Sequence, residues 1–178
     1  MNTVTNPVIA LVLPCYNEEQ ILPLTARKLA SELQRLVDSG LVSAQSKIVF
    51  VDDGSCDSTW SLIEQLSAGD SVFAGIKLAR NYGHQYALYA GLMETEADAL
   101  ISLDADLQDD VAVIEKMVTS FRAGSAIVYG VRNNRESDTR FKRHTAAAHY
   151  WLLSKMGIET VPDHAAFRLM SRRAVTFL

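Results

Sequence analysis

The chain has 178 residues, of which 48% are hydrophobic, so it can form one globular domain with a sizeable core and is not a disordered segment. A formal net charge of −4 excludes attraction of the whole surface to nucleic acid, which leaves that role only to a local basic patch. Cys15 and Cys56 are too few for a disulfide framework, and no apolar run reaches the roughly 18 residues of a membrane span. We therefore expect a single domain over residues 1–178 that is soluble as this chain.

Predicted strands and helices alternate along the chain. Short apolar runs predict buried strands at residues 8–13, 47–51, 72–78, 99–103 and 126–131. Helical spacing of apolar residues predicts helices at 18–37, 59–66, 85–94, 111–121 and within 141–156. Alternation of this kind indicates βαβ units, so we expect a doubly wound α/β fold with a mostly parallel sheet and helices on both faces.

Polar residues follow each predicted strand. In an open α/β sheet, ligands bind beyond the carboxyl ends of the strands. We therefore expect one edge of the sheet to gather the residues that follow the five strands: Tyr16, Asn17 and Glu18; Asp52 and Asp53; Arg80 and Asn81; Asp104 and Asp106; and Arg132.

The segment SLDADLQDD puts Asp104 and Asp106 where the strand at 99–103 leaves the sheet, with both side chains expected on the same side. Two close carboxylates repel each other unless a cation lies between them. Hard oxygen ligands suit Mg²⁺ or Mn²⁺, which commonly enter such sites with the phosphates of a nucleotide. The alternative interpretation is an acidic turn in which Asp109 or Asp110 caps the next helix.

The segment VDDGSCDST also follows a strand. Asp52 or Asp53 could accept hydrogen bonds from a base or a ribose, and Gly54 permits a tight turn. The structural alternative is a turn in which Asp57 or Ser58 caps the next helix. No GxGxxG follows the first strand and no GxxxxGK[ST] occurs, which argues against a dinucleotide enzyme and a P-loop NTPase.

Two further features have both a functional and a structural interpretation. His84, in RNYGHQ, could contact a sugar hydroxyl or serve the structure of its loop. A basic segment after residue 131 could bind a phosphorylated substrate or an anionic lipid surface, or form a solvated face; its cations are Arg132, Arg135, Arg140, Lys142 and Arg143.

Taken together and in this order, six segments covering nearly the whole chain resemble the family 2 glycosyltransferases that act on polyprenyl phosphates. The segments are LPCYNEE, VDDGSCDST, RNYGHQYALYAGL, SLDADLQDD, YGVRNNRESDTRFKR and FRLMSRR. The resemblance implies a GT-A fold, a nucleotide-sugar donor, Mg²⁺ or Mn²⁺, and inverting transfer of one sugar to a lipid phosphate. The segments RNYGHQ and FRLMSRR are most similar to the bactoprenol branch, which favours UDP-glucose as the donor, ahead of UDP-N-acetylhexosamine and GDP-mannose.

The resemblance also implies roles for individual residues. The nucleotide sugar would contact Pro14, Tyr16, Asn17, Glu18, Asp52, Asp53, Arg80, His84 and Asp104. The metal would be bound by Asp104, Asp106 and Gln108. The acceptor phosphate or the donor diphosphate would be held by Arg132, Arg140, Lys142, Arg143 and Arg168. Catalytic positions would be Asp104, Asp106 and the position of Ala166 or the nearby Asp163.

The chain departs from the family at Ala166, because members usually carry an acidic residue just before Phe-Arg-Leu. Natural variation and an engineered substitution both remain open as its origin. Two other functions are compatible with the sequence: transfer to a sugar or protein hydroxyl, and nucleotide-sugar binding without catalysis. Members of the bacterial branch continue into membrane helices, so we expect this chain to be an excised catalytic domain. The full protein is then expected at the cytoplasmic face of a membrane, with no nucleic-acid partner.

Overall fold

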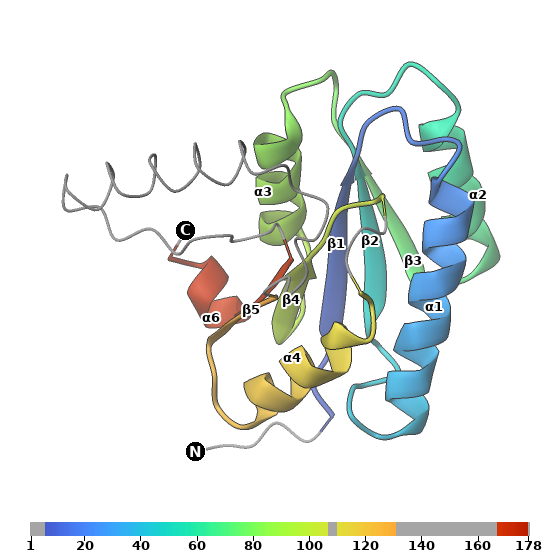
Figure 1. Ribbon diagram of the computed structural model, residues 1–178. Helices are drawn as coiled ribbons and strands as arrows, with labels where there is room; N and C mark the ends of the chain where they lie inside the picture. The colour runs from blue at the N-terminus through green and yellow to red at the C-terminus, as the bar shows by residue number, and fades with distance from the viewer. Residues whose placement is uncertain (1–5, 107–109, 131–166, 178) are drawn as a thin grey trace, which may run out of the picture.

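The structure is a computed structural model that describes residues 6–106, 110–130 and 167–177 (Figure 1). Strands and helices alternate along most of these residues, as the sequence predicted. The strands are β1 (Ile9–Cys15), β2 (Lys47–Asp52), β3 (Phe73–Lys77), β4 (Ala99–Ser102), β5 (Ile127–Tyr129) and β6 (Arg168–Ser171). The helices are α1 (Leu22–Asp38), α2 (Thr59–Gly69), α3 (His84–Glu94), α4 (Val113–Arg122) and α6 (Arg172–Val175).

The strands form one sheet in the order β3-β2-β1-β4-β6-β5. β1 pairs in parallel with β2 and β4, and β2 pairs in parallel with β3. β6 is antiparallel to both of its neighbours, β4 and β5. The predicted doubly wound, mostly parallel α/β fold is therefore confirmed.

Helices cover both faces of the sheet (Figure 1). On one face, apolar residues of α1, α2 and α4 pack with those of the strands, represented by Leu29, Ile63 and Ile114. On the other face, α3 and α6 supply Leu88 and Val175. All seven residues of β1 are buried, which explains why the sequence of this strand is a continuous apolar run.

Some predicted boundaries were wrong, for local reasons. The first helix begins at Leu22 rather than residue 18, because the Glu18 carbonyl accepts bonds from the amides of Ile21 and Leu22 in a turn before the helix. The strand β6 was not predicted, since it has four residues and only Leu169 and Met170 are buried. The predicted helix within 141–156 lies outside the described residues. Among the described helices, none is long and apolar enough to cross a membrane.

Candidate functional site

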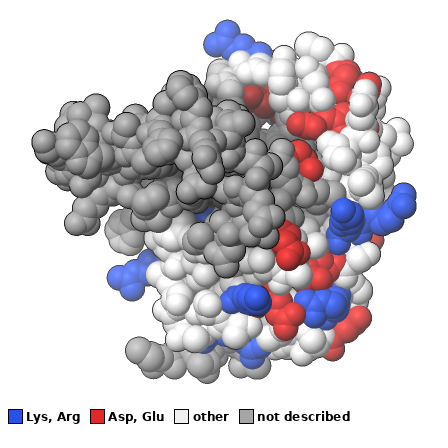
Figure 2. Space-filling model, in the orientation of Figure 1, with Lys and Arg blue, Asp and Glu red and all other residues white. Residues whose placement is uncertain are grey.

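The carboxyl ends of β1 to β4 meet at one edge of the sheet, the upper edge in Figure 1. The loops that follow these strands carry the polar residues singled out from the sequence. Figure 2 shows acidic side chains near the upper edge of the same view, where these loops lie. The site is therefore built from four loops that are far apart in sequence.

Asn17 connects the loop after β1 to the loop after β2. Its amide donates to the Ser55 hydroxyl (2.9 Å), and its side-chain Oδ1 accepts from the Cys56 amide (2.9 Å). Asn17 has a φ of +55°, a conformation that asparagine tolerates better than most residues. The amide of Glu18 donates to the Thr59 hydroxyl (2.8 Å), which adds a second connection. Asn17, predicted to bind the nucleotide sugar, thus also fixes the path of both loops.

Asp57 supplies the structural role that the sequence left open for it. Its carboxylate accepts from the amides of Thr59 (3.0 Å) and Glu19 (3.2 Å). Burial opposes ionisation of Asp57, but hydrogen bonds, first of all from Thr59, hold its pKa below the ordinary value. Ser58 is the N-cap residue of α2 but makes no side-chain cap bond. The turn interpretation of this segment is therefore right for Asp57 and wrong for the Ser58 side chain.

The end of β2 contacts the loop between β3 and α3. Asp53 accepts from the amides of Tyr82 and Gly83, each at 2.8 Å, and is 2% exposed. Asp52 is fully buried and accepts longer bonds from the Ser55 amide, at 3.3 and 3.4 Å. The two neighbouring aspartates, both predicted to face the nucleotide, therefore have different surroundings.

A hydrogen bond from α1 fixes the loop that carries Asp104 and Asp106. The hydroxyl of Thr25, a fully buried residue, donates to the Ala105 carbonyl at 2.7 Å. Ala105 is buried, whereas Asp104 is partly exposed and Asp106 is exposed. The alternation keeps the backbone fixed at Ala105 while the two carboxylates on either side reach the surface.

Asp104 and Asp106 each lie near a residue from another loop. His84 Nε2 lies 3.6 Å from Asp104 Oδ1. The pKa of Glu18 is raised, first by burial and then by the negative charges of Asp106 and Asp57. The carboxylate of Glu18, from the loop after β1, is therefore close enough to Asp106, from the loop after β4, for their charges to interact. The imidazole of His84, at the N-terminus of α3, lies beside Asp104 in the same loop after β4.

The surroundings of Asp104 and Asp106 fit a divalent metal that arrives with phosphates. No three His, Cys, Asp or Glu side chains form a complete metal cluster in the described parts of the chain. Mg²⁺ in nucleotide sites typically takes one or two protein carboxylates and completes its coordination with phosphate oxygens and water. The carboxylate pair matches that donor set, and Gln108, the third predicted ligand, lies outside the described residues.

The alternative that an aspartate caps the helix after this loop finds limited support. The N-cap residue of α4 is Ala112, which has no side chain able to cap. Asp110 Oδ1 instead accepts from the Ala112 amide at 3.0 Å, which forms a turn before the helix. Asp109 lies outside the described residues.

Arg168 is the described member of the predicted phosphate-binding set. Arg168 on β6 pairs with Ser102 on β4. Ser102 lies two residues before Asp104 in the sequence. The Nε of Arg168 is buried and has no hydrogen-bond partner among the residues that the structure describes. The remaining residues predicted for acceptor binding and catalysis lie outside the described ranges: Arg132, Arg140, Lys142, Arg143, Asp163 and Ala166.

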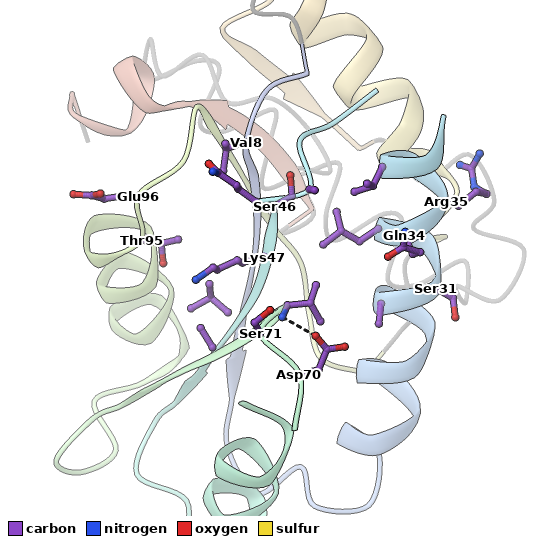
Figure 3. Close-up of a pocket in the computed structure, with 18 of the residues that line it drawn as sticks. Val8, Ser31, Gln34, Arg35, Ser46, Lys47, Asp70, Ser71, Thr95 and Glu96 are labelled. Atoms are coloured by element: carbon purple, nitrogen blue, oxygen red, sulfur yellow. Dashed lines mark hydrogen bonds between the residues drawn. The ribbon is translucent and has the colours of Figure 1, made fainter. Parts of the chain in front are cut away.

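A broad hollow of about 1510 Å³ lies at the opposite edge of the sheet (Figure 3). It is lined near the starts of β1 to β3 by Val8, Ser46, Lys47 and Ser71, among others. Of the predicted donor, metal and acceptor residues that the structure describes, none lines it. The carboxylates that converge at the carboxyl edge favour that edge, and not this hollow, as the site.

Residues 10–176 match the sequence profile of glycosyl transferase family 2. The chain belongs to this family. It is 46% identical over 173 residues to the uncharacterized glycosyltransferase YkoT of Bacillus subtilis, covering 96% of this chain and 51% of that protein. It is 38% identical over 168 residues to the bactoprenol glucosyl transferase of Shigella phage SfX, covering 94% of this chain and 53% of the relative. The chain thus spans about half the length of the curated relatives it matches.

Two solved structures with low sequence identity to this chain share its fold. One is glucosyl-3-phosphoglycerate synthase from Mycobacterium tuberculosis in complex with Mn²⁺, UDP-glucose and phosphoglyceric acid, with a TM-score of 0.63, 21% identity, and coverage of 94% of this chain and 57% of that one. Another is mannosyl-3-phosphoglycerate synthase from Rubrobacter xylanophilus, with a TM-score of 0.67, 17% identity, and coverage of 94% and 54%. The predicted GT-A fold is confirmed.

Sequence analysis missed the residues that hold the site loops in place. The hydroxyls of Thr25, Ser55 and Thr59 form hydrogen bonds with backbone groups of loops distant in sequence. Thr25 had a usable signal, because it interrupts the apolar stripe of the first predicted helix at a buried position. Ser55 and Thr59 had none, since hydroxyl residues are common in any turn.

Proposed function

We propose that this chain transfers one glucose from UDP-glucose to the phosphate of a polyprenyl lipid, with inversion at the anomeric carbon. The observation that carries the proposal is the pair Asp104 and Asp106 at the carboxyl edge, with Glu18 and His84 directed toward it from two other loops. Membership of glycosyl transferase family 2 and 38% identity to bactoprenol glucosyl transferases support the reaction class.

The nucleoside would bind across the loops after β1, β2 and β3. Tyr16 is 44% exposed at this edge and offers a ring face to a base. The guanidinium carbon of Arg80 lies 5.0 Å from the centre of the Tyr82 ring. This cation–π contact holds the Arg80 guanidinium at the same edge. Pro14, Asn17, Glu18, Asp52, Asp53, His84 and Asp104 complete the proposed nucleotide-sugar set.

The diphosphate would lie over the β4 loop, where Asp104, Asp106 and Gln108 would hold Mg²⁺ or Mn²⁺. A divalent ion bound there would offset the charge of the departing nucleoside diphosphate. The solved Mycobacterium tuberculosis synthase complex holds Mn²⁺ together with UDP-glucose, which supports the same pairing here. Carboxylates of this chain would orient the donor, and the arginines would stabilise its phosphates.

The chemistry asks little of a protein base. An acceptor phosphate oxygen forms a bond to the anomeric carbon while the bond from that carbon to the donor diphosphate breaks and its electron pair leaves on UDP. A phosphate monoester with a second pKa of about 6 is already largely ionised at neutral pH. Ala166 is therefore compatible with turnover, and Asp163 is the nearest carboxylate in sequence. The acceptor phosphate would bind Arg132, Arg140, Lys142, Arg143 and Arg168.

The acceptor determines where the protein would act. A polyprenyl phosphate resides in a membrane, so the full protein would work at the cytoplasmic membrane surface, where the nucleotide sugar is available. The basic segment after residue 131 would then have a second role at the membrane, contact with anionic lipid.

A transfer assay tests the proposal. The chain is incubated with radiolabelled UDP-glucose, MnCl₂ and either polyprenyl phosphate in detergent or a panel of sugar acceptors. We expect label in the lipid phase only with polyprenyl phosphate. Label in a sugar acceptor instead would replace the proposal with transfer to a hydroxyl group.

Ala166 favours a second candidate, a nucleotide-sugar-binding module without catalysis. The variant Ala166→Asp separates the two. We expect the chain with Ala166 to turn over and Ala166→Asp to turn over faster. Equal rates would remove this position from the mechanism, and donor binding with no turnover in either protein would favour the binding module.

A further inference from the structure

We infer that Arg172 is a positioning residue: its guanidinium binds one end of α3 and thereby sets where His84, at the other end, lies relative to Asp104. Arg172 belongs to the segment FRLMSRR, from which the proposed function uses only Arg168. The inference rests on the proposed function only where donor binding is used as a readout.

The guanidinium of Arg172 binds the C-terminus of α3. Its Nη1 donates to the Leu92 carbonyl at 3.0 Å, and its Nη2 donates to the Thr95 carbonyl. The last turn of α3 has no basic residue of its own, and its C-cap residue, Thr95, has an extended conformation. Carbonyl groups at this end of a helix carry partial negative charge and lack partners within the helix. Arg172 therefore supplies the cation that the sequence of α3 does not.

Arg172 is itself fixed to the strand that leads to Asp104. It directly follows β6, whose last residue, Ser171, pairs with Ala99 at the start of β4. The Arg172 amide also donates to the Asp98 carbonyl, just before β4, at 2.9 Å. The other end of β4 leads into the loop of Asp104. The guanidinium therefore connects α3 to the same strand that determines the position of Asp104.

The apolar contacts of α3 fix its distance from the sheet more than its position along its own axis. A Cβ built at Gly91 would lie 2.5 Å from the side chain of Val12 and 2.6 Å from that of Val51, so the helix lies close on β1 and β2. Apolar contacts have no preferred direction. The axial position of α3 needs directional bonds, and Arg172 supplies them at the C-terminal end.

The axial position of α3 decides where His84 lies. His84 is the first residue of this helix, and its Nε2 lies 3.6 Å from Asp104 Oδ1. At a rise of about 1.5 Å per residue, His84 lies about 12 Å along the helix from Leu92. The backbone hydrogen bonds of the helix carry a displacement at one end to the other. Loss of the Arg172 contacts should therefore change the separation between His84 and Asp104.

The first test observes His84 directly and needs no ligand. The histidine ring resonances are recorded by NMR at one pH in the unsubstituted chain, Arg172→Met and Arg173→Met, and His84→Gln identifies the His84 signal among those of the four histidines. Arg173 is the matched control because it is the next residue of α6 and is exposed. We expect the His84 signal to shift in Arg172→Met and to stay unchanged in Arg173→Met. An unchanged His84 signal in a folded Arg172→Met chain, or an equal shift in both variants, would overturn the inference.

The second test is a double-mutant cycle read by calorimetric titration with UDP-glucose and MnCl₂. We expect Arg172→Met to weaken binding about fivefold in the chain with His84 and less than about twofold in the His84→Ala background. A loss of equal size in both backgrounds would mean that Arg172 acts by another route and would overturn the inference. If UDP-glucose binds none of the proteins, the proposed donor fails, while the His84 signal still decides the role of Arg172.

Arg172→Lys provides a second variant if Arg172→Met does not fold. It keeps the positive charge at the end of α3 but replaces the planar fork that binds Leu92 and Thr95 with a single ammonium group. The positioning role then predicts a shift of the His84 signal and a loss of donor binding that disappears in the His84→Ala background. An unchanged His84 signal in the folded Arg172→Lys chain would then count against the inference.

Discussion

The hydroxyl of Thr25 on α1 donates a hydrogen bond to the carbonyl of Ala105, at 2.7 Å, across 80 residues of sequence. Thr25→Val keeps the shape of the side chain but leaves that buried carbonyl without its partner. We expect a loss of about 1–3 kcal/mol in the free energy of unfolding, measured with urea, because an unmade bond to a buried acceptor costs this much.

Thr119→Val is the control for this change. The Thr119 hydroxyl bonds to the Glu115 carbonyl within α4, at an exposed position. Its replacement should alter stability by less than about 0.5 kcal/mol. If both variants lose the same amount, the Thr25 contact has no special role in holding the loop of Asp104 and Asp106.

Gly54→Ala should destabilise the chain by about 2–4 kcal/mol, because the new Cβ meets backbone and the residue has a positive φ. Gly40→Ala isolates the conformational part, since Gly40 has a φ of +68° with nothing within 4 Å of the Cβ position. We expect about 1 kcal/mol there. Equal losses in urea unfolding would show that the Arg80 backbone yields to the added methyl group.

Glu18→Gln should raise the Tm at pH 7 by a few degrees at most, since the side chain is partly solvated. The folded-state pKa of Glu18 is raised, by burial and then by Asp106 and Asp57, so its ionisation disfavours the folded state. The stabilising protonation is complete below the unfolded pKa of about 4.3 and is lost as pH rises through the higher folded value. The Tm difference should therefore vanish near pH 3, and a difference that grows toward acid would contradict this assignment.

The two thiols should react at different rates. Burial, followed by the charges of Glu18 and Asp52, raises the pKa of Cys15 well above its ordinary range. Cys56 is exposed. Titration with a thiol reagent at pH 8 should modify one equivalent quickly and the second only after unfolding. Rapid modification of both thiols in the folded chain would show that the interior beneath the β1 loop is open to solvent.

The sequence predicted the fold well because its main signals are local. Apolar runs such as the one in β1 are buried on both faces and leave little choice of structure. The strand β6 escaped prediction because its pairing with β4 depends on residues about 70 positions away, Ser102 with Arg168. Four residues with two buried side chains carry no local pattern that specifies such a partner.

The candidate site was predicted in its composition but not in its connections. The carboxyl-edge rule placed Asn17, Asp53 and Asp104 at one edge, where the structure has them. That Asp53 binds the amides of Tyr82 and Gly83 could not be read from the sequence, because backbone amides are the same at every position. The motif VDDG therefore combines residues with different surroundings, and only the structure separates them.

Calorimetric titration of UDP-glucose into the unsubstituted chain and Asp106→Asn, each with and without MnCl₂, tests the central claim most directly. Asp38→Asn, at the far end of α1, is the matched control. The account predicts binding that requires Mn²⁺, weakens at least tenfold in Asp106→Asn and is unchanged in Asp38→Asn. Binding of equal strength without metal and in Asp106→Asn would contradict it.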